Sequence, residues 1–119
     1  MANKYGAKKC GYKGQVFDSK GERACYLYLC AQELAGEIRI VGNQETVKLT
    51  KAKIAYRADF KIFDNQLNQE VWIEFKGCET AVWKIKKRLW KHYGPGILRV
   101  YKGDEKTISL VEEIIPIQE

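Results

Sequence analysis

Apolar residues recur at helical spacing in two segments of the chain. The first segment begins near Asp18 or Ser19, either of which can cap a helix. Ser19 followed by Glu22 has the S-x-x-E spacing of a capping box. Gly36 is a suitable stop for this helix. The apolar face that we expect for the helix consists of Ala24, Leu27, Tyr28, Ala31 and Leu34.

The second helical segment covers residues 80–93 and ends before Gly94-Pro95-Gly96. We expect Trp83 and Trp90, seven residues apart, to flank its buried stripe. That stripe is predicted to consist of Val82, Ile85, Leu89 and either His92 or Tyr93. Basic residues cover most of the remaining helix surface: Lys84, Lys86, Lys87, Arg88 and Lys91.

Alternating apolar and polar residues predict strands at 46–50, 55–63, 70–76 and 97–101. Residues 107–117 can form either a strand or a short helix. The order α-β-β-β-α-β predicts a mixed α/β (α+β) domain with a central mixed sheet flanked by helices. The strand at 55–63 is expected to place these residues on one face: Tyr56, Ala58, Phe60 and Ile62. Its other face would carry Arg57, Asp59 and Lys61.

Length and composition fit a single folded domain. The chain has 119 residues, and we expect one domain over 1–119 with a flexible basic arm at residues 1–15. No apolar run approaches the roughly 20 residues of a membrane span. Residues 1–13 lack the apolar stretch of a secretory signal, so the cytoplasm is the expected compartment. The net charge of +6 favours a polyanionic partner, nucleic acid first.

The four cysteines do not suggest a zinc site. They form no C-x-x-C pair, and His92 is the only histidine. We therefore expect free thiols in a reducing compartment.

The candidate chemistry lies on the two central strands. Strand alternation places Glu74 and Lys76 side by side on one face, with Asp59 on the preceding strand close to Glu74. Two carboxylates that are not surrounded by basic side chains repel each other and favour the binding of a hard cation. Mg²⁺ takes oxygen ligands and keeps several waters, and the carbonyl of Phe75 is a suitable further ligand. Mn²⁺ is expected to substitute for Mg²⁺.

A solvated strand face is the alternative interpretation of this Glu-x-Lys pattern. Trp72 and Ile73 before it favour a buried strand, and an unpaired Asp59 beside Phe60 would be costly. In the catalytic interpretation, Mg²⁺ polarises a scissile phosphate and acidifies the attacking water. Lys76 can orient or deprotonate that water, or offset charge in the transition state, and the sequence leaves these roles open. Glu22 can complete a second metal site or hold a water if the first helix packs over the sheet.

The pattern Asp59…Glu74-x-Lys76, in this order of elements, resembles the PD-(D/E)xK nucleases, whose fold is that of the restriction endonucleases. Residues 17–22 (FDSKGE) are similar to the helix start of phage-type Holliday junction resolvases. Residues 56–60 (YRADF) and 72–77 (WIEFKG) are similar to two of their strands. The resemblance spans about residues 16–101. It departs from the family at Ala58, where proline often stands.

The resemblance implies a restriction-endonuclease-like αβββαβ core and a Mg²⁺-dependent endonuclease that cuts branched DNA, such as four-way junctions. It implies that Glu22, Asp59 and Glu74 are metal ligands and that Lys76 is the catalytic lysine. It further implies a homodimer, encoded by a phage or prophage and acting in the bacterial host cell.

Basic residues are expected to contact the DNA phosphates. These are Lys84, Lys86, Lys87, Arg88 and Lys91, together with Lys13 and Arg57. Trp83 and Trp90 can stack on bases, but packing in the core or at a dimer interface is the favoured interpretation. Two alternatives to a junction resolvase stay open: a nicking or restriction-like nuclease on duplex DNA, and a non-catalytic nucleic-acid-binding module with the same fold. RNA is a lower-ranked substrate.

Overall fold

The computed structural model describes residues 10–12, 15–17, 19–52, 54–104 and 106–117 of the chain. In chain order the elements are β1 (Cys10–Tyr12), β2 (Gln15–Phe17), α1 (Lys20–Leu34), β3 (Ile38–Lys48), β4 (Ala55–Asp64), β5 (Gln69–Phe75), α2 (Ala81–Tyr93), β6 (Ile97–Gly103) and β7 (Ile108–Ile114). The strands β3-β4-β5-β6-β7 form one five-stranded sheet in that order, and β1 pairs with β2. Only β5 and β6 are parallel. The predicted α+β class, with a central mixed sheet flanked by helices, is therefore confirmed.

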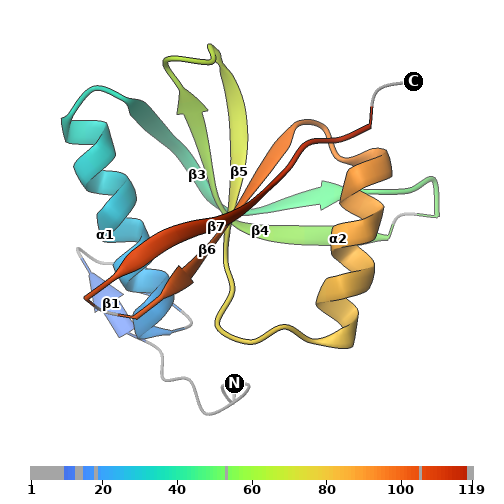
Figure 1. The fold of residues 1–119 in the computed structure, drawn as a ribbon, viewed down its shortest axis with the longest axis horizontal. Helices are drawn as coiled ribbons and strands as arrows, with labels where there is room; N and C mark the ends of the chain where they lie inside the picture. Colours follow the sequence, from blue (N-terminus) through green and yellow to red (C-terminus); the bar gives the residue numbers. More distant parts are fainter. Residues whose placement is uncertain (1–9, 13–14, 18, 53, 105, 118–119) are drawn as a thin grey trace.

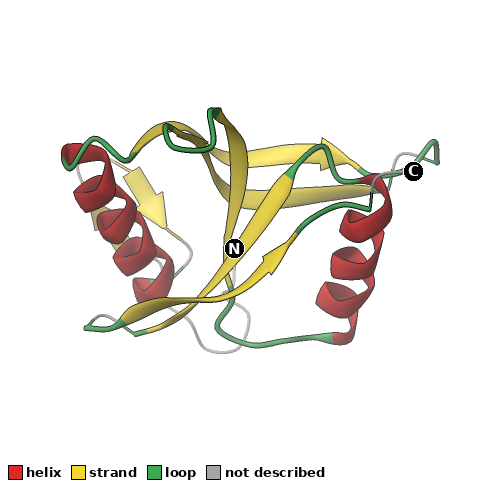
Figure 2. Cartoon of the chain, turned by 45° about the horizontal axis from the view of Figure 1, so that its top comes forward, coloured by secondary structure: helices red, strands yellow, loops and turns green. Residues whose placement is uncertain are grey.

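The two helices cover opposite faces of a strongly twisted sheet (Figures 1 and 2). Neighbouring residues on β5 show this directly, because successive side chains of a strand point to opposite faces. Ile73 is buried with Cys25 and Leu29 of α1, whereas Trp72 is buried with Trp83 and Trp90 of α2. We call these two clusters the α1 core and the α2 core.

Strand β4 contributes to both cores, which corrects the predicted single apolar face. Phe60 and Ile62 lie in the α1 core, but Tyr56 and Ala58 lie in the α2 core. The strand therefore changes faces around Asp59. On the neighbouring strand, Gln44 has a positive φ of 51° between the paired residues that face Phe60 and Ala58. This irregularity is long-range, so the alternation of β4 alone could not predict it.

Helix α1 begins as predicted but buries a different face. The side chain of Ser19 accepts a hydrogen bond from the backbone N–H of Glu22 at 3.0 Å, which caps the helix. The buried residues of the helix are Glu22, Cys25 and Leu29. By contrast, the predicted face contains Leu34, which is 91% exposed. The other members of that face are exposed or half-buried: Ala24, Leu27, Tyr28 and Ala31. Apolar periodicity missed the buried face because a carboxylate belongs to it.

Helix α2 is likewise rotated relative to the prediction. Val82 and Ile85, expected in the core, are 63% and 59% exposed, and both His92 and Tyr93 are exposed as well. Only Leu89 packs partly against the α2 core. The buried positions belong instead to two indoles, Trp83 and Trp90. Each indole removes more apolar area from water than a valine or isoleucine does, so the helix turns to bury both.

The prediction for Trp83 and Trp90 is settled in favour of core packing. The indole N–H of Trp90 donates a hydrogen bond to the carbonyl of Gly96 at 2.8 Å, which satisfies the polar atom of this fully buried ring. Trp83 lies in the first turn of the helix, where its backbone N–H donates to the side chain of the N-cap residue Thr80 at 3.1 Å.

Three further predictions about elements are corrected or completed. The predicted strand at 46–50 is the end of a longer strand, β3, that begins at Ile38. The C-terminal segment forms an edge strand, β7, rather than a helix. Within the segment 1–15, expected to be a flexible arm, residues 10–12 and 15 pair in the β1–β2 hairpin. Lys13 lies outside the described residues.

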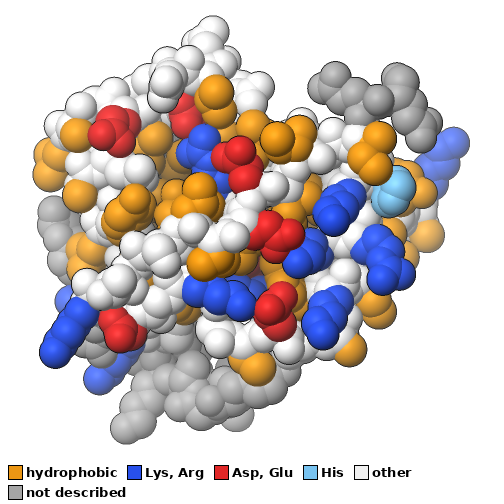
Figure 3. All heavy atoms as spheres, in the orientation of Figure 1, with side chains coloured by type: hydrophobic (Ala, Val, Ile, Leu, Met, Phe, Trp, Pro, Cys, Tyr) orange, Lys and Arg blue, Asp and Glu red, His pale blue; other side chains and the backbone are white. Residues whose placement is uncertain are grey.

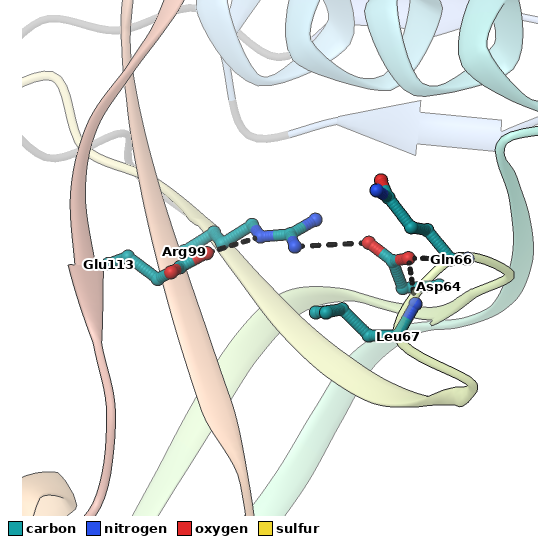
Figure 4. A network of polar contacts seen from close by, with 5 residues as sticks. All are labelled: Asp64, Gln66, Leu67, Arg99 and Glu113. Atoms are coloured by element: carbon teal, nitrogen blue, oxygen red, sulfur yellow. Dashed lines mark hydrogen bonds and ion pairs between the residues drawn. The ribbon is translucent and has the colours of Figure 1, made fainter.

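A network of ion pairs and hydrogen bonds is centred on Asp64 and Arg99 (Figure 4). Arg99 of β6 pairs with Asp64 at 3.0 Å and with Glu113 at 2.9 Å. Asp64 also accepts hydrogen bonds from the backbone N–H groups of Gln66 and Leu67, at 2.9 Å each. Partial burial acts to raise the pKa of Asp64, but the Leu67 N–H and the Arg99 guanidinium outweigh it and lower that pKa. The network joins β4, β6 and β7.

Neither helix in the described part of the chain is long and apolar enough to cross a membrane. The three cysteines whose side chains are described are free thiols, as expected: Cys25, Cys30 and Cys78.

Candidate active site

The predicted site residues come from three elements that meet where β5 ends. Figure 1 shows the first turn of α1, the end of β5 and the first turn of α2 on the same, lower side of the molecule. The contact between α1 and β5 is close, because a Cβ atom on Gly21 would lie 2.4 Å from ring carbons of Phe75. The glycine therefore lets α1 approach the sheet. Its neighbour Glu22 is consequently buried, with 4% of its surface exposed.

Asp59 lies where β4 and β5 separate. The pairing of these strands runs from Asp64 and Gln69 as far as Phe60 and Ile73. Beyond that point the side chain of Asp59 replaces the backbone ladder. Its Oδ2 atom accepts a hydrogen bond from the backbone N–H of Phe75 at 2.8 Å. This bond fixes the Asp59 carboxylate beside the backbone that links Glu74 to Lys76.

Glu74 in β5 and Lys76 directly after the strand lie side by side, as the strand period predicted. Their Oε2 and Nζ atoms are 2.9 Å apart. The ammonium group of Lys76 also lies 4.6 Å from the ring centroid of Trp83, within reach of a cation–π interaction. Glu74 is buried, whereas Lys76 is partly exposed. The lysine is therefore the member of this pair that solvent can reach.

The charges of Glu74 and Glu22 act on the carboxylate of Asp59. Burial raises the pKa of Asp59 well above its usual range, and the charges of Glu74 and Glu22 raise it further. The Phe75 N–H and the Lys76 ammonium oppose this rise without cancelling it. The pKa of Glu74 is also raised, because its burial outweighs the opposing effect of Lys76. The cluster therefore favours the uptake of positive charge, either as a proton or as a cation.

Two residues at the site were not predicted from the sequence. Cys25, fully buried on α1, has its pKa raised by burial and then by the charges of Asp59, Glu22 and Glu74, so its thiol is neutral near pH 7. Its spacing of three from Glu22 was the available signal, since such residues share a helix face. Tyr56, also buried, has its pKa raised by burial and then by the charge of Glu74. Its alternation with Asp59 gave no indication of this role.

The Tyr56 hydroxyl and the Glu74 carboxylate are close without forming a regular hydrogen bond. The hydroxyl acts on the pKa of Glu74 as a hydrogen-bonding neighbour and lowers it. Nevertheless, neither the Tyr56 hydroxyl nor Oε1 of Glu74 has a partner of regular geometry among the described residues. The two groups are therefore buried neighbours, and each keeps hydrogen-bonding capacity that the described residues do not use.

These residues fit a divalent cation with oxygen ligands. Within the described ranges, no three His, Cys, Asp or Glu side chains already form a cage for a metal ion. Mg²⁺ does not require one, since it binds through one or two carboxylates and keeps several waters. Asp59 and Glu74 would supply the carboxylates, and both are buried next to each other at the end of β5. The donors are all oxygen, as a hard cation requires.

The structure separates the predicted DNA-contacting residues into two groups. Lys84, Arg88 and Lys91 are exposed on α2. Lys86 instead donates to the carbonyl of Ala55, and Lys87 pairs with Glu112 at 2.8 Å. Arg57 is exposed on β4. Figure 3 shows Lys and Arg side chains gathered over α2, on the right of the view, with hydrophobic side chains between them.

A twisted mixed sheet has one helix on each face, and Asp59, Glu74 and Lys76 lie where β4 and β5 separate. With Glu22 of α1 beside them, they define a small α+β domain with an acid–lysine cluster. The chain belongs to the family described as "Protein of unknown function (DUF1064)", which matches residues 2–103. This span contains all four clustered residues: Glu22, Asp59, Glu74 and Lys76. No curated protein matches the chain.

Proposed function

We propose that the protein is a metal-dependent endodeoxyribonuclease that hydrolyses phosphodiester bonds in branched DNA. The observation that carries this proposal is the effect of the Glu74 and Glu22 charges on the buried Asp59 carboxylate, beside the ammonium group of Lys76. Such a group of acids raises its own pKa values unless a cation neutralises it. A phosphate-cleaving site needs that cation together with a neighbouring positive group.

Asp59 and Glu74, with the carbonyl of Phe75, would hold Mg²⁺ or Mn²⁺, and Glu22 would complete a second position or hold a water. A bound divalent cation would stabilise the negative charge that develops on the phosphate. The hydrogen bond from the Phe75 N–H to Asp59 orients one ligand before any cation binds. Such preorganisation lowers the cost of assembling the site.

Lys76 is the catalytic lysine of this proposal. Its ammonium group is held by Glu74 on one side and by the Trp83 ring on the other, and it remains partly exposed. From that position it can donate a hydrogen bond to a phosphate oxygen or orient a water. If the Glu74 carboxylate held the cation, the Lys76 ammonium group would be available to contact the substrate.

DNA as the partner is supported by the net charge of +6 and by the exposed basic residues of α2, namely Lys84, Arg88 and Lys91. The preference for branched DNA, the homodimer and the location in the cytoplasm of a bacterial host rest on the resemblance to the phage-type resolvases. These three features are part of the proposal on the strength of that resemblance.

The test compares cleavage of a synthetic four-way junction with cleavage of a linear duplex of the same arm sequence. We expect paired nicks in the junction with Mg²⁺ or Mn²⁺ and none with EDTA. Equal rates on both substrates would replace the resolvase with a nicking or restriction-like nuclease. Salt-dependent binding without cleavage in either metal would make the chain a non-catalytic DNA-binding module. Light scattering of the purified protein tests the homodimer.

A further inference from the structure

The buried carboxylate of Glu74 has an oxygen atom without a regular hydrogen-bond partner, and the inference drawn from it rests on the proposed function and deepens it. Glu74 is 5% exposed, and its Oε2 atom pairs with the ammonium group of Lys76, while the Asp59 backbone and the Tyr56 hydroxyl are further hydrogen-bonding neighbours of the carboxylate. Oε1 has no hydrogen-bond partner among the residues that the structure describes. A buried carboxylate oxygen without a partner is costly, so something is expected to engage this atom when the site works.

Tyr56 is the neighbour suited to that task. It is 8% exposed, and its hydroxyl is the other buried, unpartnered polar group at this site within the described part of the chain. Its ring is fixed by aromatic contacts with Trp83 and Trp90, whose centroids each lie 5.8 Å away. The ring therefore has little freedom, and its hydroxyl is held as a hydrogen-bonding neighbour of the Glu74 carboxylate. A hydroxyl can donate one hydrogen bond to a carboxylate and still accept another.

Trp83 has the corresponding relation to Lys76. Its indole ring lies 4.6 Å from the Lys76 ammonium group and packs against Tyr56 on the same side of the sheet. The Trp83 side chain is 3% exposed, and the Trp83 backbone N–H donates a hydrogen bond to the side chain of Thr80. The ring is therefore fixed at the first turn of α2. Indole is the strongest cation–π partner among the side chains. It holds an ammonium group without neutralising it.

We propose that Tyr56 and Trp83 are positioning residues of this site: Tyr56 donates a hydrogen bond to Glu74, and Trp83 fixes the ammonium group of Lys76. The pair forms an aromatic support beneath the acid–lysine pair. Tyr56 directs the carboxylate so that its other oxygen faces the cation position. Trp83 keeps the lysine next to that position when Glu74 is occupied by the cation.

The first experiment needs neither metal nor DNA. Protein labelled with ¹³C at the glutamate carboxyl groups is compared by NMR with Tyr56→Phe, which keeps the ring and removes the hydroxyl. The Glu74 resonance is assigned as the one missing from Glu74→Gln. We expect Tyr56→Phe to move that resonance and its pH profile. The control variant Tyr93→Phe, which removes an exposed hydroxyl at the end of α2, should leave both unchanged. An unmoved Glu74 resonance in Tyr56→Phe would overturn the role of Tyr56.

The second experiment measures cleavage. Tyr56→Phe should raise the Mg²⁺ concentration needed for half-maximal cleavage roughly tenfold, as expected for the removal of one hydrogen bond to a charged group, while KM for DNA stays unchanged. Trp83→Leu should lower kcat with little change in KM, and Trp83→Phe, which keeps an aromatic ring, should recover most of the activity. Equal kcat in Trp83→Leu and wild type would overturn the role of Trp83.

The two experiments separate this inference from the proposed function. A Glu74 resonance that responds to Tyr56→Phe in a protein that cuts no DNA would support the positioning role of Tyr56 and refute the nuclease. Cleavage by wild type, with no response of the Glu74 resonance or of the Mg²⁺ requirement, would support the nuclease and refute the positioning role. Thermal melting of each variant confirms that the fold is retained.

Discussion

Asp59 on β4 and Phe75 on β5 are joined by a hydrogen bond of 2.8 Å from the Phe75 backbone N–H to Oδ2 of Asp59. The bond lies just beyond the last paired residues of the two strands, where the backbone ladder has ended. A carboxylate therefore fixes the separation of the strands and, through it, the backbone on which Glu74 and Lys76 stand. The Asp59 side chain therefore has two roles, one in holding the two strands and one in the candidate metal site.

Asp59→Asn separates these two roles. An asparagine side-chain oxygen can still accept the hydrogen bond from Phe75, but it carries no charge and is a poor ligand for Mg²⁺. We expect cleavage of the four-way junction to fall by at least about a hundredfold, while junction binding stays within about twofold. Cleavage is measured on labelled junctions under single-turnover conditions, and binding by fluorescence anisotropy in Ca²⁺.

The matched control for this change is Asp104→Asn, in the turn between β6 and β7. Asp104 is exposed and accepts hydrogen bonds from Lys106 and Thr107. The substitution removes the same charge away from the cluster, so the cleavage rate should stay at the wild-type value. Full activity of Asp59→Asn would refute the assignment of the metal site.

Lys76→Met should abolish cleavage and also destabilise the protein. Removing the ammonium group leaves the buried Glu74 carboxylate without its salt-bridge partner, at a cost of about 3–5 kcal/mol for a buried pair and less here because Lys76 is partly exposed. Adding Glu74→Gln should restore stability without restoring cleavage. Urea unfolding of the two single variants and the double variant measures this coupling. Strictly additive losses would show that the pair contributes nothing.

The exposed basic residues of α2 should determine the salt dependence of DNA binding. Replacing Lys84, Arg88 and Lys91 together by glutamine should lower the slope of log K against log salt by about 0.9 for each phosphate that these side chains no longer neutralise. Lys106→Gln, which changes an exposed lysine outside α2, should leave the slope unchanged. Anisotropy titrations between low and moderate salt provide the slopes. A triple variant with the wild-type slope would place the DNA on another surface.

The sequence predicted the part of the site that depends on short-range pattern. Strand alternation placed Glu74 and Lys76 on the same face, and the structure pairs them. The cap spacing located Ser19 and Glu22 at the first turn of α1. Both follow from backbone geometry within a few residues, which a sequence displays directly.

Orientation across the sheet could not be predicted in the same way. Two stripes of α2 have helical spacing, one containing Val82 and Ile85 and the other Trp83 and Trp90, and periodicity cannot choose between them. The choice follows from the total area buried, which favours the indoles. The division of β4 between two cores was hidden for a similar reason, because it depends on how β3 pairs with it around Asp59. The position of Tyr56 beside Glu74 depends on that division.

The rotation of α2 leads to a prediction about stability. Ile85→Ser should change the free energy of unfolding by no more than about 0.5 kcal/mol, because Ile85 is 59% exposed. Trp90→Ala should cost about 3–5 kcal/mol, since the indole is fully buried and leaves both a cavity and an unpaired Gly96 carbonyl. Urea unfolding of both variants measures the difference. A large loss of stability in Ile85→Ser would mean that the helix is turned as the apolar stripe predicted.

Asp59 and Asp64 should affect stability at neutral pH with opposite signs. The pKa of Asp59 is raised by burial and by its acidic neighbours, so folding takes up a proton there and stability falls as the pH rises above the unfolded value of about 3.9. Asp64 has a lowered pKa, because its hydrogen bonds and Arg99 outweigh its burial. The stability it contributes is fully present above the unfolded pKa and is lost as the pH falls through the folded pKa.

In metal-free buffer at pH 7, we therefore expect Asp59→Asn to melt above wild type and Asp64→Asn to melt below it. The Asp59 difference should shrink as the pH falls toward 3, where its carboxyl group is protonated in both the folded and the unfolded chain, and the Asp64 difference should shrink as the pH falls below the unfolded value of about 3.9. Calorimetry between pH 3 and pH 7 supplies the melting temperatures. If Asp59→Asn instead melted below wild type at pH 7, the carboxylates around Asp59 would not repel one another, and the main argument for a cation at this site would be removed.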